Sequence, residues 1–266
     1  MLDVRKEPKM FEVDRHREIL ELLRTEKSIS VHKLAAKLYV SESTVRRDLN
    51  RLASAGMLQR SFGGAVLVED INSEVPLIVR DEKNSAEKKT IARLAASLIE
   101  ENDIIFVDPS STAYALLPYL DERVKAVVTN SPKVSLALAS NPSLNIYLTG
   151  GYLRKNALSL VGHHAEEMLA NFNCTKMFFS CTSISKSQLS DLNEEEANLK
   201  RKMLRQSKTI VAMLDHTKFG LTAFSHVCNL TSIDYVVTDM FPGDEWIRIF
   251  EENNIKLLCA PPFNKE

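Results

Sequence analysis

A chain of 266 residues that is 44% hydrophobic and 26% charged can bury a core without disulfide bonds, and its four widely separated cysteines exclude a zinc-finger framework. The charged N-terminus and the absence of a long apolar run predict a cytoplasmic protein with no signal peptide and no membrane contact. The formal net charge of −1 is unevenly distributed, because residues 1–67 carry 13 Lys and Arg against 9 Asp and Glu. The remainder carries 21 against 26, so only the basic N-terminal part is expected to meet an anionic polymer.

The first sixty residues contain three helical patterns. Residues 14–24 show the apolar spacing of an amphipathic helix. Ser30 and Ser41 then stand as N-caps before two further helices, and Gly56 supplies a C-cap to the last of them. Two short helices joined by a tight turn form a helix-turn-helix, whose second helix can enter the major groove of DNA.

The helix that follows Ser41 has two distinct faces. Val45, Leu49 and Leu52 are spaced to face a core. The opposite face carries hydroxyl groups that can approach phosphates and arginines that can fork onto phosphate or guanine. The candidate DNA-binding residues are Ser41, Ser43, Thr44, Arg46, Arg47 and Arg51, with Arg60 on a two-stranded wing that turns at Gly63-Gly64. On pattern alone, a helical hairpin with solvated arginines remains an alternative.

The wording of residues 34–65, LAAKLYVSESTVRRDLNRLASAGMLQRSFGGA, closely resembles the DNA-binding region of the DeoR family of bacterial repressors. The resemblance implies that the hydroxyl residues, Arg46 and Arg47 belong to the DNA-facing surface and that Arg60 lies at the wing. Phe62 is a departure, since the family usually has His before the Gly-Gly pair.

Residues 68–84 are polar and largely aperiodic, which predicts a linker between a winged helix-turn-helix DNA-binding domain (1–67) and an effector-sensing domain (85–266). Beyond the linker, apolar runs alternate with amphipathic helices. The expected helices are 85–102, 112–120, 131–140, 193–207 and 244–254, and the expected strands are 103–108, 124–130, 144–151, 208–215, 232–239 and 255–260. This alternation predicts an α/β fold with a mainly parallel sheet covered on both faces.

Polar residues follow several of these strands, and ligands of such sheets bind beyond the carboxyl ends of the strands. Hydroxyl groups can donate to a phosphate, Lys and Arg supply counter-charge, and Asp and Asn hold sugar hydroxyls. The candidate effector-binding residues are Asp108, Ser110, Ser111, Thr112, Thr129, Asn130, Gly150, Gly151, Arg154, Asp215 and Lys218. At each single position a helix cap or a turn is the alternative interpretation.

The sequence motifs at these strand ends also resemble those of one family. IFVDPSST (105–112), VVTN (127–130), GGYLR (150–154), EEANLKRKM (195–203), DHTKFG (215–220) and IDYVVTD (233–239) resemble motifs of the DeoR-family sensor domain, whose fold is related to ribose-phosphate isomerase. The resemblance implies a transcription regulator, usually a repressor, whose phosphorylated sugar effector binds the residues above together with Lys200. Ser110 stands where the family usually has Gly, and residues 183–193 lack the family's Gly-Thr pair.

Two other functions remain open. Asp215 and Lys218 could serve as acid and base in a sugar-phosphate isomerase-like enzyme, although an isomerase has no need of a DNA reader. An architectural DNA binder without an effector would leave the polar strand ends unexplained. Glu194–Glu196 is expected to be a solvated helix start, and neither a metal nor a cofactor is expected. One winged helix contacts few bases, so a homo-oligomer, a dimer or tetramer, is predicted on double-stranded operator DNA.

Overall fold

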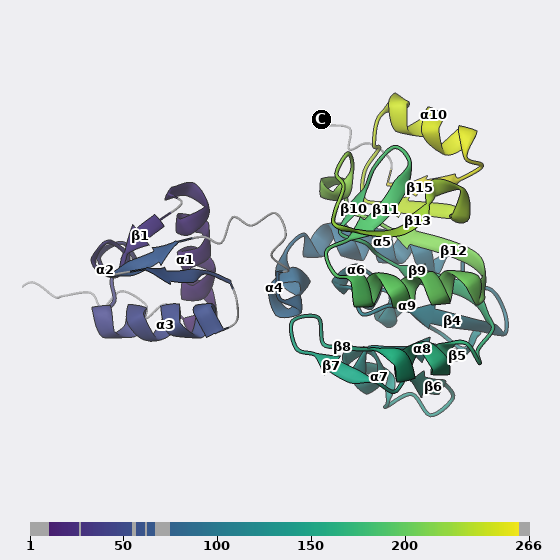
Figure 1. Cartoon of the computed structure of the whole chain (residues 1–266), viewed down its shortest axis with the longest axis horizontal. Coiled ribbons are helices and arrows are strands. Elements are labelled where there is room, and N and C mark those ends of the chain that lie inside the picture. The colour runs from purple at the N-terminus through teal and green to yellow at the C-terminus, as the bar shows by residue number, and fades with distance from the viewer. Residues whose placement is uncertain (1–10, 27, 55–56, 62, 67–74, 261–266) are drawn as a thin grey trace, which may run out of the picture. The chain divides into compact units, whose positions relative to one another are not determined.

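The computed structural model describes residues 11–26, 28–54, 57–61, 63–66 and 75–260 (Figure 1). The chain divides into two compact units, Met1–Pro76 and Leu77–Glu266. Gly56, Phe62 and residues 67–74 of the expected linker lie outside the described residues.

The first unit is the expected winged helix-turn-helix. Its elements are α1 (Glu12–Glu26), β1 (Ser28–Ser30), α2 (Val31–Leu38), α3 (Glu42–Ser54), β2 (Gln59–Ser61) and β3 (Gly64–Val66). The wing strands β2 and β3 pair in an antiparallel way, and β1, which the sequence did not predict, adds a third strand beside β3. The fold of this unit is therefore confirmed, with one additional strand.

Local side-chain contacts explain where the two helices of the motif begin. The hydroxyl of Ser30 accepts a hydrogen bond from the Lys33 amide at 3.2 Å, and that of Ser41 accepts one from the Thr44 amide at 3.2 Å. Both predicted N-caps are confirmed. Tyr39 ends α2 in the left-handed conformation, with φ of 53°, and this sharp reversal separates the two helices.

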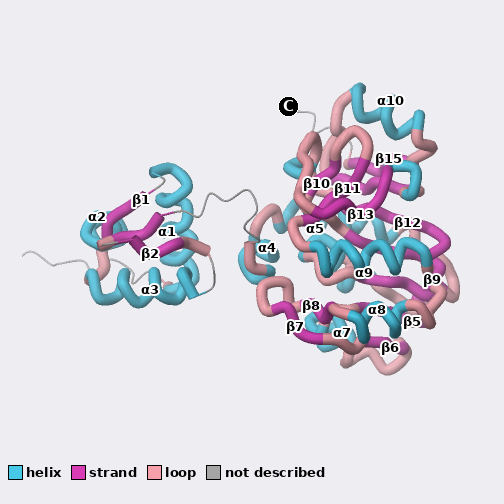
Figure 2. The backbone as a smooth tube through the Cα atoms, in the orientation of Figure 1, coloured by secondary structure: helices cyan, strands magenta, loops and turns pink. Residues whose placement is uncertain are grey.

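The second unit is built on a seven-stranded sheet with the order β15-β14-β12-β9-β4-β5-β6, in which every pairing is parallel (Figure 2). The strands are β4 (Asp103–Val107), β5 (Val124–Thr129), β6 (Asn145–Leu148), β9 (Cys174–Phe179), β12 (Ser207–Met213), β14 (Tyr235–Thr238) and β15 (Lys256–Cys259). The predicted parallel α/β architecture is confirmed. Its central strand, β9, was not predicted.

Smaller sheets and helices complete this unit. A three-stranded antiparallel sheet contains β10 (Ser183–Ile184), β11 (Gln188–Asp191) and β13 (Ser225–Asn229), and β7 (Tyr152–Arg154) pairs with β8 (Ser159–Val161). The α-helices are α4 (Leu77–Glu82), α5 (Ser85–Ala96), α6 (Ser111–Tyr114), α7 (Pro132–Leu138), α8 (His163–Leu169), α9 (Glu194–Arg205) and α10 (Asp244–Glu252). The 3-10 turns are η1 (Leu117–Tyr119), η2 (His216–Lys218) and η3 (Leu230–Ser232).

Alternation along the strands places apolar side chains on both faces of the sheet. Ile105 and Val107 join one buried cluster, which includes side chains of α5 and α7, whereas Phe106 joins a second cluster with α8, α9 and α10. A sheet buried on both faces leaves its strand ends as the place where polar residues can gather.

One part of the expected linker has regular structure. Residues 77–82, expected to be part of an aperiodic connection, form α4, and the Leu77 amide donates to the carbonyl of Asn156 at 2.7 Å. The short run Val75-Pro76-Leu77-Ile78 was the only apolar signal in that segment, and Leu77 is the residue of α4 that is buried. The helix is thus held by contacts within the second unit.

Candidate DNA-binding surface and effector site

The polar face of α3 is exposed, as its pattern predicted. Val45 and Leu49 are fully buried and Leu52 nearly so, which fixes the orientation of the helix. Thr44 is half-buried, and the remaining DNA-binding candidates are exposed: Ser41, Ser43, Arg46, Arg47, Arg51 and Arg60. The arrangement can present hydroxyls and guanidinium groups to a nucleic acid.

Two of these arginines have acidic neighbours. Arg46 donates from Nη2 to Oε2 of Glu42 at 2.9 Å, and Arg51 forms an ion pair with Glu12 on α1. The sequence analysis did not single out either glutamate. Both lie at exposed positions, so the arginine positive charge is partly neutralised before any ligand approaches.

A buried ion pair lies behind this surface. Arg15 donates from Nε to Oδ2 of Asp48 at 2.5 Å and from Nη2 to Oδ1 at 3.0 Å. Burial by itself raises the pKa of Asp48, but the hydrogen bonds and charges of Arg15 and His16 together outweigh burial and hold that pKa below its ordinary value. The sequence carried a signal for this pair, because Asp48 falls between Val45 and Leu49 on the apolar face of α3.

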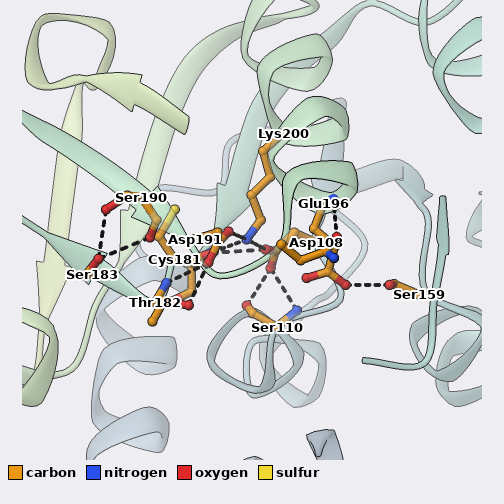
Figure 3. Close-up of polar contacts among 12 residues, drawn as sticks. Asp108, Ser110, Ser159, Cys181, Thr182, Ser183, Ser190, Asp191, Glu196 and Lys200 are labelled. Atoms are coloured by element: carbon orange, nitrogen blue, oxygen red, sulfur yellow. Dashed lines mark hydrogen bonds and ion pairs between the residues drawn. The ribbon is translucent and has the colours of Figure 1, made fainter. Parts of the chain in front are cut away.

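In the second unit, Asp108 follows β4 and is fully buried at the carboxyl edge of the sheet (Figure 3). Its Oδ1 accepts hydrogen bonds from the Ser110 hydroxyl at 2.5 Å and the Ser110 amide at 3.1 Å. The same hydroxyl caps α6 by accepting from the Ala113 amide. Burial raises the pKa of Asp108, and Lys200 opposes that rise.

Lys200 connects α9 to this edge. Its ammonium lies 2.5 Å from Oδ2 of Asp191, 3.3 Å from Oδ2 of Asp108 and 2.6 Å from the carbonyl oxygen of Ser180. Burial alone would lower the pKa of Lys200, but the two carboxylates outweigh burial and raise it. The structure thus places two of the expected effector residues, Asp108 and Lys200, in one buried charge cluster with Asp191 (Figure 3).

A second lysine, which is partly buried, lies beside this cluster. Lys218 donates to the Ser180 hydroxyl and to the Cys181 carbonyl, each at 2.8 Å, and its ammonium is 4.0 Å from Asp215. Burial lowers the pKa of Lys218 against the opposing charge of Asp215. Asp215 also contacts Asn84, whose amide lies 3.4 Å away, so the ends of β4, β9 and β12 share one polar network.

Three buried polar atoms at this edge have no hydrogen-bond partner within the described part of the chain. They are the hydroxyls of Thr112 and Thr149 and the side-chain oxygen of Asn130. The three residues follow β4, β6 and β5, which are neighbours in the sheet. Because buried polar groups are nearly always paired, such atoms indicate a site for a polar ligand or water.

Other expected effector residues already have structural contacts. Thr129 donates to the Val107 carbonyl at 2.7 Å, and Arg154 pairs with Glu196 at 2.7 Å. A side chain at Gly151 would collide with the Val161 carbonyl, which explains that glycine. Gly150 lies beside it, and Ser111 is buried at the start of α6.

One expectation about α9 is wrong. Glu196, expected in a solvated helix start, is buried and accepts from the Ser159 hydroxyl at 2.6 Å as well as from Arg154 (Figure 3). The apolar spacing of Ala197 and Leu199 did not reveal this, because Glu196 is buried by contacts with the β7–β8 hairpin.

Comparisons with known proteins now bear on this arrangement. The DeoR C terminal sensor domain matches residues 83–240, and the DeoR-like helix-turn-helix domain matches residues 15–70. The chain belongs to the DeoR family. As a member of this family, the protein is a DNA-binding transcriptional regulator.

The similarity to other regulators extends over almost the full length of this chain and of each relative. The transcriptional regulator YulB of Bacillus subtilis is 33% identical over 95% of this chain and 98% of its own. The repressor GlcR of the same organism is 32% identical over 94% and 97%, and the glycerol-3-phosphate regulon repressor of Escherichia coli is 29% identical over 94% and 100%.

A solved structure of ribose 5 phosphate isomerase A from Neisseria gonorrhoeae has a TM-score of 0.37 and 15% identity, over 54% of this chain and 55% of that one. That similarity is too weak to bear on function. Among the described residues of this DeoR-family regulator, no group of His, Cys, Asp and Glu could hold a metal ion. None of the helices in the described ranges has the length and apolarity that a membrane span requires.

Proposed function

We propose that this DeoR-family regulator represses genes of sugar metabolism and that a phosphorylated sugar controls its binding to operator DNA. The effector site is assigned to the carboxyl edge of the seven-stranded sheet. One observation carries this assignment: three unpaired buried polar atoms follow three neighbouring strands, in a unit whose strand ends also hold the buried Lys200 and the partly buried Lys218. Two relatives named as repressors, GlcR and the glycerol-3-phosphate regulon repressor, support repression as the direction of control.

The chemistry of the edge suits such a ligand. Hydroxyls of a sugar can donate to the free oxygen of Asn130 and to Asp108 and Asp215, and its phosphate can accept from the Thr112 hydroxyl. We assign the phosphate to the 110–112 turn, with Lys218 as its counter-charge. Arg154 is a weaker candidate for that role because its guanidinium is already paired with Glu196.

Binding controls DNA affinity only if the effector prefers one conformation of the protein. A preference of roughly 2 kcal/mol changes operator affinity about thirtyfold, and operator DNA must then change effector affinity by the same factor. We expect this reciprocity here. We further expect a cytoplasmic dimer or tetramer that binds repeated half-sites on DNA and catalyses no reaction of its effector. Light scattering of the free protein and of its DNA complex measures the assembly state, and a monomer in both would refute that part.

Calorimetric titration with a panel of sugar phosphates and the matching unphosphorylated sugars tests the effector site. We expect binding of a phosphorylated sugar alone, strongly weakened by Lys218→Ala and unchanged by Lys186→Ala, whose exposed ammonium pairs with Glu245. Binding that Lys218→Ala and Ser111→Ala leave untouched would show that the site is elsewhere. Promoter binding measured with and without the same compounds then tests control of transcription.

The sugar-phosphate isomerase alternative is tested in the same solutions. An enzyme that used Asp215 and Lys218 as acid and base would convert a bound aldose phosphate into its ketose isomer. Proton NMR of each effector incubated with the protein should show no conversion above that of the Lys218→Ala variant.

A further inference from the structure

A carboxylate lies in the polar surface of the recognition helix. Glu42 is the first residue of α3, and its two oxygens have different neighbours. Oε2 accepts from Nη2 of Arg46 at 2.9 Å, and Oε1 lies 3.3 Å from Nδ1 of His32 on α2. The side chains of Glu42, Arg46 and His32 are 43%, 60% and 88% exposed.

The stability of the fold does not account for Glu42. An exposed ion pair one helical turn apart contributes little, and the first turn of α3 is already capped by Ser41. In contact with DNA, the same carboxylate is repelled by phosphates and so opposes binding that does not depend on sequence. A residue that adds little stability and weakens general affinity suits a role in selectivity.

The two adjacent arginines of α3 differ in a way that fits this role. Arg47 is exposed, and no described residue forms an ion pair with it, so its charge is available to phosphates. Nη2 of Arg46 donates one hydrogen to Glu42, which leaves four N–H groups of the planar guanidinium to donate. Nη2 carries two hydrogens, so one can bind Glu42 while the other donates to guanine together with the neighbouring N–H group. An arginine held in one orientation loses less conformational entropy when it forms these two hydrogen bonds.

We propose that Glu42 is a specificity-determining residue that acts through Arg46. It orients the guanidinium for bidentate hydrogen bonding to one guanine in the major groove, and its charge disfavours contacts of that guanidinium with phosphates of other sequences. This inference rests on DNA binding through α3 and is independent of the effector, so failure of the effector site leaves it intact.

Selection from a pool of random-sequence duplexes tests the inference, with wild type, Glu42→Gln and Glu26→Gln compared in the full-length protein. Glu26 is the matched control, because it pairs with Lys33 and Lys37 and its change removes the same charge from the same unit. We expect Glu42→Gln to lose roughly tenfold preference for guanine at one position of the selected site. Glu26→Gln should select the wild-type sequence.

Salt titration on one scrambled duplex gives a second readout. Arg46 released from Glu42 can neutralise one more phosphate, so the slope of log affinity against log salt should steepen by about 0.9 in Glu42→Gln. Glu42→Asp keeps the charge but shortens the side chain. If orientation matters, this variant also loses the guanine preference, and full retention of preference would overturn the inference.

A double-mutant cycle with Arg46→Ala separates two modes of action. If Glu42 acts through Arg46, adding Glu42→Gln to Arg46→Ala changes the selected sequence no further. If the two effects add, Glu42 contacts a base by itself and the positioning role is wrong. Thermal unfolding of each variant should match wild type, since the pair is exposed; a large loss of stability in Glu42→Gln would make the pair structural and also overturn the proposal.

Discussion

The hydroxyls of Thr112 and Thr129 have opposite surroundings although both lie at the carboxyl edge of the sheet. The Thr129 hydroxyl donates to the Val107 carbonyl and accepts from the Ser131 amide, whereas the Thr112 hydroxyl is buried with no partner among the described residues. An unsatisfied buried hydroxyl costs on the order of 1–3 kcal/mol. Thr112 therefore lowers the stability of the ligand-free protein, and we expect its hydroxyl to serve ligand binding instead.

Thr112→Val should raise the free energy of unfolding of the free protein, or leave it unchanged, and weaken effector binding at the same time. Thr129→Val should instead lower the free energy of unfolding by about 1–3 kcal/mol, because a buried hydrogen bond is lost. Urea unfolding combined with calorimetric titration measures both quantities. A Thr112→Val protein that is destabilised as much as Thr129→Val would show that the hydroxyl is paired within the fold.

Arg47 differs from Arg46 in having no ion pair with a described residue. We expect Arg47→Ala to weaken binding to operator and scrambled duplexes alike and to reduce the salt slope by about 0.9, because one phosphate contact is lost. Fluorescence anisotropy between 50 and about 200 mM salt gives the slope. An unchanged slope would remove Arg47 from the DNA interface.

At the scale of elements, α4 is held by polar contacts from three sides. Lys88 on α5 donates to the carbonyls of Arg80 and Lys83, and Lys133 on α7 pairs with Asp81. Asn84, just beyond the helix, contacts Asp215 at the proposed effector site. Burial, followed by the charge of Lys218, lowers the pKa of Lys88 to about 8. We therefore expect a ligand that binds Asp215 to affect α4 through Asn84.

Lys88→Met should loosen α4, since the carbonyls of Arg80 and Lys83 lose their donor. Hydrogen exchange at the amides of residues 77–83 should accelerate in this variant, while exchange in α10 stays as in wild type. Lys89→Met is the control, because Lys89 is exposed on the same helix. Equal exchange in Lys88→Met and wild type would contradict the anchoring role. Effector binding should also alter exchange in α4.

The elements that sequence reasoning recovered are those with a clear period or cap. Continuous apolar runs marked β4, β5 and β12, and amphipathic patterns marked α7 and α9. The central strand β9 was not predicted because Lys176 interrupts its apolar run. That lysine is buried against Asp103, with Nζ 2.8 Å from Oδ2, so a tertiary ion pair satisfies a charge that sequence alone would place in solvent.

The failure to predict β9 also explains which residues of the candidate site were missed. Ser180 follows β9, and Asp191 is the last residue of the short strand β11, so neither lay at an expected strand end. Their link to Lys200 depends on contacts between residues distant in sequence. Asp108, Asp215 and Lys218 were among the predicted residues because they follow the apolar runs that form β4 and β12.

At the scale of the whole molecule, two compact units imply two separable contributions to stability. Acid should destabilise the N-terminal unit through Asp48. Its pKa in the fold lies below the ordinary value of 3.8, so its contribution is present above that pH and is lost as the pH falls through the folded value. The melting temperature of this unit should fall as the pH drops below about 4.

Asp48→Asn should cost about 3–5 kcal/mol at neutral pH, because the buried Arg15 charge loses its partner. Asp14→Asn is the control: its pair with Arg17 is exposed, and its loss should cost at most about 1 kcal/mol. Calorimetry of the full chain should show the effect of Asp48→Asn in one transition alone. A shift of both transitions by similar amounts would contradict independent units.

The central position of β9 has a consequence during protein synthesis. The strands β4, β5 and β6 leave the ribosome first, yet β4 lacks one neighbour until Cys174–Phe179 has emerged. An unpaired strand edge invites pairing with other nascent chains. Asp103 on β4 and Lys176 on β9 place opposite charges on the two strands that must find each other, and an unmatched charge disfavours pairing with a foreign apolar strand. We therefore expect the unmatched charge of Asp103 to disfavour aggregation of the half-made sheet until Lys176 emerges and pairs with it.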